Sequence, residues 1–242
     1  MINVNETLNT SINDRLTNRL KSINLVELMD IYDVKEVYLG GNSLNVDKPN
    51  DYDLYLKESD SLRLYNSSNM ILIETKLLEA GYEILTKSKN AITLSKNNIC
   101  YQICKYSKAS LKELIDSFDF SYCQVGARIY NYAGELSIKE IYYTDHYIEY
   151  LLTKNTKFIN SEYPLSSLIR CFKINDKGYF LGKSYIPAVI NILTNIINRG
   201  FDNYADFKDQ LDAVDLGLLE EDYKDAKEDF LKLFEMLNKN KD

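Results

Sequence analysis

The spacing of apolar residues changes near Tyr147, and this change limits the folds open to the 242-residue chain. Before it, short segments alternate apolar with polar residues, as half-buried β-strands do, and turns rich in glycine and asparagine separate them. After it, apolar residues recur at the spacing of amphipathic helices. We therefore expect an α+β fold, with a mixed sheet and flanking helices in residues 1–146 and an all-helical C-terminal domain in residues 147–242.

Helices and strands are expected to be mixed through the first part of the chain. An amphipathic helix is predicted over residues 10–32, with Arg15, Arg19 and Lys21 on the side opposite its apolar stripe. The other elements predicted before Tyr147 are helices at residues 70–80 and 110–116, strands at 34–39, 51–56, 82–85, 91–94, 99–106 and 118–125, and a hairpin at 128–137. The helices predicted after it are at residues 166–174, 186–198, 204–214 and 219–237.

Composition is that of an ordinary globular protein, with 45% hydrophobic and 27% charged residues. The chain has no run of about 18 apolar residues, so no membrane span is expected. Its N-terminal residues lack the basic-then-apolar order of a signal peptide, so the cytoplasm is the expected location.

Cysteine and histidine usage disfavours a zinc site. The four cysteines form no Cys-x-x-Cys pair, and His146 is the single histidine. Any metal is therefore expected to be a hard cation held by carboxylates, namely Mg²⁺ or Mn²⁺.

The formal net charge of −7 constrains the partners. Proteins that grip nucleic acid nonspecifically are usually basic, so extended nonspecific nucleic-acid binding is not expected. A small acceptor, a protein acceptor and an RNA end bound through a local basic patch all stay open.

Two motifs close together in the sequence carry the chemistry. The predicted strand 34–39 runs into the turn Gly40-Gly41-Asn42-Ser43, and after a loop Asp51-Tyr52-Asp53 opens the next strand. Alternate strand residues point to the same face about 6.6 Å apart, so Asp51 and Asp53 are expected side by side and able to chelate magnesium. The glycine turn exposes backbone N–H groups suited to a triphosphate, and Ser43 adds a hydroxyl.

This segment resembles the signature of the nucleotidyltransferase superfamily, which includes DNA polymerase beta, poly(A) polymerases, CCA-adding enzymes and aminoglycoside nucleotidyltransferases. The signature is a Gly-Gly or Gly-Ser turn, a loop, and Asp-x-Asp between apolar positions. The resemblance implies that Asp51 and Asp53 are metal ligands and that Gly40, Gly41 and Ser43 contact the phosphates of a nucleoside triphosphate. It is strong over this segment and extends to the rest of the chain only in architecture.

Members of that superfamily also carry a third carboxylate on a later strand, where it binds the catalytic metal and helps to deprotonate the acceptor hydroxyl. The position that aligns with it here is Gln102, and a neutral amide cannot act as a base. Asp119 is the next candidate, either as a functional acid or as a structural one. This departure from the family pattern bears more on catalysis than on nucleotide binding.

A second, fainter resemblance lies in the helical part. Residues 164–170 match the Pro-x-x-x-Leu-x-Arg stretch that follows the catalytic domain of CCA-adding enzymes. Arg170 and Lys173 are three residues apart and share a helix face. They are candidates to bind the triphosphate or an RNA phosphate, and the alternative is a solvated basic face.

Together these features predict a magnesium-dependent enzyme that moves a nucleoside monophosphate from a triphosphate to an acceptor hydroxyl, with Asp119 as candidate third acid. An RNA 3′ end, such as that of a tRNA, is the favoured acceptor. One alternative is a small-molecule or protein acceptor, as in antibiotic-modifying or toxin-like relatives. Another is a non-catalytic module that only binds a nucleotide or a partner. Gln102 favours the module, whereas the retained pair of Asp51 and Asp53 argues against it, because adjacent carboxylates repel each other without a cation between them.

Overall fold

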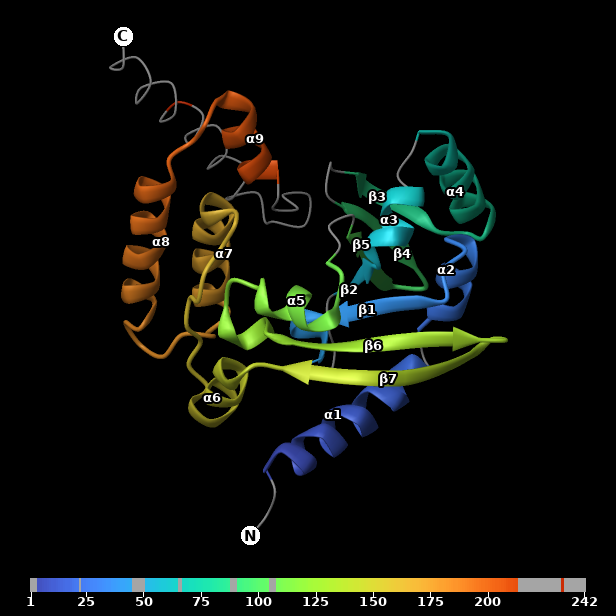
Figure 1. Ribbon diagram of the computed structural model, residues 1–242, viewed down its shortest axis with the longest axis horizontal. Helices are drawn as coiled ribbons and strands as arrows, with labels where there is room; N and C mark the ends of the chain where they lie inside the picture. The colour runs from blue at the N-terminus through green and yellow to red at the C-terminus, as the bar shows by residue number, and fades with distance from the viewer. Residues whose placement is uncertain are drawn as a thin grey trace.

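In the part of the chain that the structure describes, seven strands form one mixed sheet in the order β3-β4-β5-β2-β1-β6-β7 (Figure 1). The computed structural model describes residues 4–21, 23–44, 51–64, 67–87, 91–104, 108–212 and 232. The loop predicted at residues 45–50 and, Lys232 apart, the helix predicted at 219–237 lie outside the described residues. The strands are β1 Glu36–Gly40, β2 Asp51–Leu56, β3 Glu83–Lys87, β4 Ala91–Lys96, β5 Ile99–Cys104, β6 Val125–Tyr132 and β7 Glu135–Tyr143. Only β2 and β5 pair in parallel among these neighbours.

Helices occupy both faces of the sheet and the segment after it. In the first part they are α1 Val4–Leu20, α2 Leu25–Ile31, α3 Glu58–Leu64, α4 Ser67–Glu79 and α5 Leu111–Asp116, with the short 3₁₀ turns η1 Gly41–Leu44 and η2 Ser121–Cys123. The prediction of a single helix over residues 10–32 is wrong, because α1 ends at Leu20 and a separate helix, α2, begins at Leu25. Helix α3 was not predicted, since its seven residues carry too short an apolar pattern to be read from sequence.

The main hydrophobic core lies between one face of the sheet and helices α1 to α4. Strand β2 contributes Leu54 and Leu56 to it, while α1 contributes Leu16 and α2 contributes Leu28. All four side chains are almost completely buried. Burial of such side chains is the principal source of stability in a domain of this size, at about 1.5–3 kcal/mol each.

Helix α5 covers part of the opposite face. Its Leu114 and Ile115 pack against Tyr38 of β1, and Ser110 caps the helix by accepting a hydrogen bond from the Glu113 N–H. Strand β6 has Gly126 beneath this helix, where an added Cβ would lie only 2.5 Å from Ile115. The helix therefore sits close over β1 and β6.

The strand predicted at residues 118–125 is wrong. The segment makes only an isolated bridge from Phe120 to Phe158 and then forms η2, and β6 begins at Val125. The aromatic run is buried for a different reason: Phe120 packs against Phe158 and Phe180 in a second core shared with the helical part. The predicted hairpin is confirmed, with Ala133 and Gly134 in left-handed conformations at its turn.

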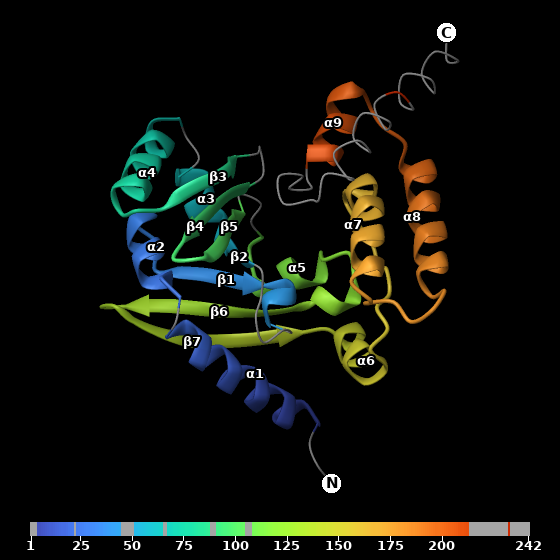
Figure 2. The ribbon, with the colours of Figure 1, turned by 180° about the vertical axis from the view of Figure 1, so that it is seen from behind.

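From Asp145 to Asp212 the regular elements are helices: α6 Asp145–Thr153, α7 Pro164–Asp176, α8 Tyr185–Arg199 and α9 Tyr204–Asp212. Figure 2 shows α7 and α8 side by side. Helix α9 packs on α7, where the Ser166 hydroxyl donates to the Gln210 carbonyl. Among the described residues, no helix combines the length and the apolar character that crossing a bilayer requires.

Candidate functional site

Strand β2 displays Asp51 and Asp53 on the same face. Residues 51, 53 and 55 of this strand are half-buried, whereas the intervening residues 52, 54 and 56 are buried in the main core. The alternation of the sequence therefore predicts the orientation of this strand correctly. The acidic face is the one that α5 partly covers, because Tyr38, which packs under α5, pairs with Tyr55.

The glycine turn lies directly beside Asp53. Gly40 pairs with Asp53 in the β1–β2 ladder, and Gly41 has a φ of +79°, which favours glycine strongly. A Cβ on Gly41 would lie 3.4 Å from the Asp53 Oδ2 atom, so the carboxylate rests against this residue. A Cβ on Gly40 would lie 3.1 Å from the Phe118 ring. The first glycine therefore makes room for Phe118, and the second permits the turn under the carboxylate.

Ser43 stabilises the glycine turn through a hydrogen bond within it. Its buried hydroxyl donates to the Gly40 carbonyl at 3.2 Å. Two arginines of α1 secure the same turn, since Arg19 donates to the Ser43 carbonyl and Arg15 donates to the Leu44 carbonyl at 3.2 Å. Phosphate contact by Ser43 stays a prediction, and its hydroxyl has a structural partner here.

The solvent-facing position expected for Arg19 is wrong, because its side chain is buried. Arg19 is buried because it donates to a carbonyl at the end of η1. The last carbonyls of so short a helix have no partner within it and need donors from elsewhere. The sequence gives one signal for this contact: Arg15 and Arg19 are four residues apart and so lie on the same side of the helix. No sequence pattern identifies the turn that they reach.

Gln102 occupies the position next to Asp53 on the parallel neighbour strand. The β2–β5 register pairs Asp53 with Gln102 and Asp51 with Cys100. The Cys104 thiol lies 3.9 Å from the Gln102 side-chain oxygen, toward which it donates. The neighbour of the aspartates on β5 is thus an amide that offers an acceptor oxygen and a donor nitrogen but no charge.

Asp119 is buried and engaged with α7. Its Oδ2 atom accepts a hydrogen bond from the Ser167 hydroxyl at 2.7 Å, and its Oδ1 atom accepts one from Arg170 Nη1 at 3.1 Å. The Asp119 side chain is 5% exposed, whereas the Arg170 side chain is 39% exposed. Although burial acts against the charged guanidinium, the Asp119 carboxylate raises the pKa of Arg170, so the guanidinium stays charged.

The structure brings this pair close to the strand aspartates. The Phe118 ring packs on the Tyr55 ring, with centroids 5.7 Å apart, and against Gly40. Burial raises the pKa of the Tyr55 hydroxyl well above its ordinary value, and the charge of Asp53 acts in the same direction while that of Arg170 opposes it. The charges of Asp53 on β2 and of Arg170 on α7 therefore both influence the pKa of the Tyr55 hydroxyl. The predicted partner of Arg170 on its helix, Lys173, lies one turn further along α7 and is half-buried.

A divalent cation fits the donor set of β2, since carboxylate oxygens are the ligands that Mg²⁺ and Mn²⁺ prefer. The described part of the chain has no group of three or more His, Cys, Asp or Glu side chains placed to hold a metal ion. Asp51 and Asp53 would therefore share such an ion with oxygens from other sources. Phosphate oxygens of a bound nucleotide are the usual additional ligands of Mg²⁺.

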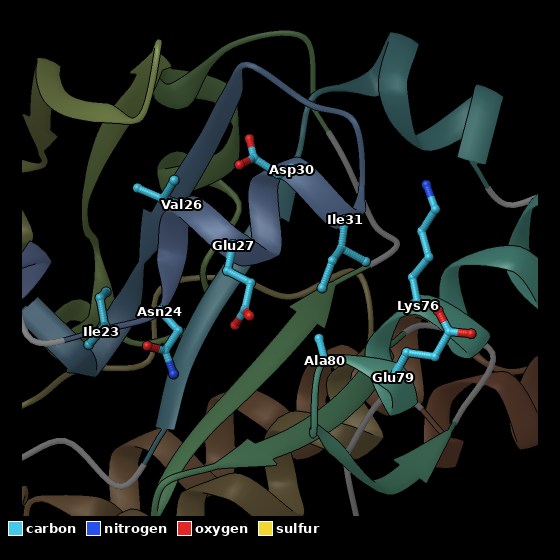
Figure 3. Close-up of a pocket in the computed structure, with 9 residues that line it drawn as sticks. All are labelled: Ile23, Asn24, Val26, Glu27, Asp30, Ile31, Lys76, Glu79 and Ala80. Carbon is cyan, nitrogen blue, oxygen red and sulfur yellow. The ribbon is translucent and has the colours of Figure 1, made fainter.

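An open groove elsewhere on the surface is separate from these residues. It lies between α2 and α4, on the side of the main core, and Figure 3 shows Glu27, Lys76 and Glu79 among its lining. Glu27 is already bound there, because its Oε2 atom accepts hydrogen bonds from Lys96 at 2.6 Å and from the Tyr82 hydroxyl at 2.9 Å. Mainly through the Lys96 contact, the pKa of Glu27 is lowered. The groove is lined by the carboxylates of Glu27, Asp30 and Glu79 but includes none of the site residues predicted from the sequence, so the β2 face is the stronger candidate.

Comparison of the chain with models of protein families finds no match, and comparison with curated proteins finds none either. Function is therefore inferred from the residues of the β2 face and from their geometry.

Proposed function

We propose that the protein is a magnesium-dependent nucleotidyltransferase that moves a nucleoside monophosphate from a nucleoside triphosphate to an acceptor hydroxyl and releases pyrophosphate. The observation that carries the proposal is the position of Asp53: its carboxylate rests on Gly41, shares a strand face with Asp51, and acts with Arg170 on the Tyr55 hydroxyl. Two anions thus share a strand face beside a glycine turn, and the charge of Arg170 acts on the same Tyr55 hydroxyl as that of Asp53. Such a set suits a metal-bound polyphosphate.

Each residue has a defined part in this proposal. Asp51 and Asp53 hold Mg²⁺ or Mn²⁺, which when bound neutralises charge on the phosphates. The Gly40-Gly41 turn and Ser43 lie beneath the triphosphate. The cations Arg170 and Lys173 of α7 face its phosphate oxygens, with Arg170 the better supported because its position is fixed by Asp119. We propose likewise that residues 1–146 form a nucleotidyltransferase-like domain and residues 147–242 a helical domain.

The deprotonation of the acceptor is the step for which this chain departs from the superfamily that it resembles. Gln102 stands where a third carboxylate is expected, directly beside Asp53. Asp119 is the remaining candidate base, yet both of its oxygens accept hydrogen bonds from α7. Catalysis in such sites is mostly positioning and charge stabilisation, so a transferase with a weakened base still accelerates transfer.

A non-catalytic nucleotide-binding module is the second candidate function. The neutral Gln102 beside Asp53 favours it, because the site then keeps the ligands for a metal–nucleotide complex but lacks an adjacent base. For the enzyme, an RNA 3′ end such as that of a tRNA is the proposed acceptor, with a small molecule or a protein as the alternatives.

Incubation of the purified protein with each radiolabelled triphosphate, Mg²⁺ and total RNA tests these functions. The Asp51→Ala/Asp53→Ala variant serves as the negative control, and Glu58→Ala, at an exposed acid just after β2, serves as the matched control. Label in RNA supports the favoured acceptor, and label in protein or in a small product supports the alternatives. Triphosphate binding without any transfer supports the module, and the absence of both contradicts the proposal.

A further inference from the structure

The contact between Asp119 and Arg170 joins two distant parts of the chain. The residues are 51 apart in sequence, and their side chains meet where the segment before η2 packs against α7. Ser167, one turn before Arg170 on the same helix, holds the second oxygen of Asp119. The carboxylate is therefore bound from one helix face by a neutral donor and a cation.

The exposure of the two side chains differs in a way that suggests their roles. Asp119 is almost fully enclosed, at 5% exposure, whereas Arg170 retains 39%. A guanidinium carries five N–H donors in a planar fork, and Asp119 Oδ1 accepts from one of its terminal nitrogens. The exposed part of the pair is thus the cation, and the buried part is the anion that fixes its orientation.

A direct metal-binding role would require Asp119 to exchange these partners. Turning an oxygen toward the ion at Asp53 would take that oxygen from the Arg170 guanidinium or from the Ser167 hydroxyl. Losing a hydrogen bond to an enclosed carboxylate is unfavourable, and the loss is larger when the donor is charged. The geometry observed here is therefore better suited to orienting Arg170 than to holding metal.

We propose that Asp119 is a positioning residue, which fixes Arg170 so that the guanidinium faces the phosphates of a nucleotide bound at Asp51 and Asp53. This inference rests on the proposed function, and it replaces the assignment of Asp119 as third acid. The metal site then consists of two carboxylates beside the neutral Gln102. Its ligand class is a metal-bound polyphosphate, held by the metal at one end and by Arg170 at the other.

Titration calorimetry on the full chain tests the inference, with Mg²⁺–ATP and Mg²⁺–tripolyphosphate as probes. Asp119→Asn and Arg170→Gln should each weaken binding of both probes roughly tenfold or more, as expected for a charged hydrogen bond. The double variant should bind no worse than Arg170→Gln alone, because Asp119 acts only through Arg170. Asp206→Asn is the matched control, since it breaks another Arg–Asp pair of the helical part, with Arg199, and should leave affinity unchanged.

The dependence on metal separates positioning from metal binding. The Mg²⁺ concentration that gives half-maximal probe binding should be the same for Asp119→Asn and the unmodified protein. An increase in that concentration, additive losses in the double variant, or unchanged affinity in Asp119→Asn would each overturn the inference while leaving the proposed function intact. Absence of probe binding by the unmodified protein would overturn both.

Protein stability needs its own readout, because Asp119 is buried. Melting temperatures are measured for every variant, and the double variant leaves no unpaired charge. If Asp119→Asn fails to fold, Arg170→Lys tests the inference instead. Lysine keeps the positive charge but lacks the planar set of N–H donors of the guanidinium. Arg170→Lys should therefore bind tripolyphosphate more weakly than the unmodified protein and more tightly than Arg170→Gln. Equal affinity of both Arg170 variants and the unmodified protein would overturn the inference.

Discussion

Gln102 lies beside Asp53 in the ladder between the parallel strands β2 and β5, so an uncharged amide is the immediate neighbour of the acidic pair. A nucleotidyltransferase combines ligands for a metal ion with a base for the acceptor hydroxyl, and the pairing of Asp53 with Gln102 separates these two properties. In the proposed site Asp51 and Asp53 would provide oxygen ligands for a divalent ion, whereas Gln102 on the adjacent strand provides neither negative charge nor a base.

Replacing that amide with an acid should strengthen metal binding. In Gln102→Asp three carboxylates would share one face, so the variant should be less stable than the unmodified protein without metal and should gain more stability from added Mg²⁺ or Mn²⁺. Melting temperature with and without each ion measures both effects. Gln102→Asn, which keeps the amide, is the control. An equal response of the two variants to metal would contradict the placement of an ion at this face.

Gly41→Ala should damage both stability and binding. The φ of +79° strains any other residue, at a cost of about 1–2 kcal/mol, and the new methyl group would lie in contact with the Asp53 carboxylate, 3.4 Å from its Oδ2 atom. Gly134→Ala is the matched control, because Gly134 has a φ of +85° and nothing within 4 Å of its Cβ position. Urea unfolding should show similar losses for both, whereas nucleotide binding should fall only in Gly41→Ala. Unchanged binding in Gly41→Ala would place the ligand elsewhere.

Arg19→Met should loosen the glycine turn. The substitution keeps much of the apolar stem but leaves the buried Ser43 carbonyl without this donor, which costs about 1–3 kcal/mol of unfolding free energy. Urea unfolding measures the loss. Lys21→Met, at an exposed position just after α1, should change stability by less than about 0.5 kcal/mol. Similar effects of the two substitutions would mean that Arg19 does not support the turn.

Alkaline pH should destabilise the protein through its buried thiol and phenol groups. Burial raises the pKa of Cys171 from 9.0 to about 11, and burial also raises the pKa values of Tyr55 and Tyr122. A raised folded-state pKa means that the folded state holds the proton more tightly. The contribution of Cys171 is therefore complete below pH 9 and is lost as pH rises through about 11. Urea unfolding across this range should show the decline, and Cys171→Ala should show a shallower one. A stability that rises with pH would contradict these shifts.

Local patterns predicted much of the sheet. The alternation of Asp51-Tyr52-Asp53-Leu54 indicates both a strand and the face that each residue takes, because one face of β2 is buried in the core. The strand predicted from the sequence over residues 118–125 was wrong. Their aromatic side chains are buried by packing on Phe158 and Phe180 rather than by pairing in the sheet, and apolar content alone cannot distinguish these two kinds of burial.

The candidate site was only partly predictable, for a related reason. Asp51, Asp53 and the glycine turn are close together in sequence, so strand geometry suffices to bring them together. The contacts of Asp119 with Arg170 and of Arg19 with Ser43 join residues 51 and 24 positions apart. Such contacts depend on how whole elements pack, and no local pattern in a single sequence specifies them.

The most direct measurement of the central claim is titration of ATP into the protein with and without Mg²⁺, repeated with Asp51→Asn/Asp53→Asn. These isosteric amides keep the shape of the site and remove both charges. If Asp51 and Asp53 hold the metal, the unmodified protein should bind ATP only with Mg²⁺ present, and the double variant should lose at least about 100-fold in affinity, as expected when two charged metal ligands are removed. Equal binding by the two proteins, or binding that does not depend on Mg²⁺, would contradict this role of the two aspartates.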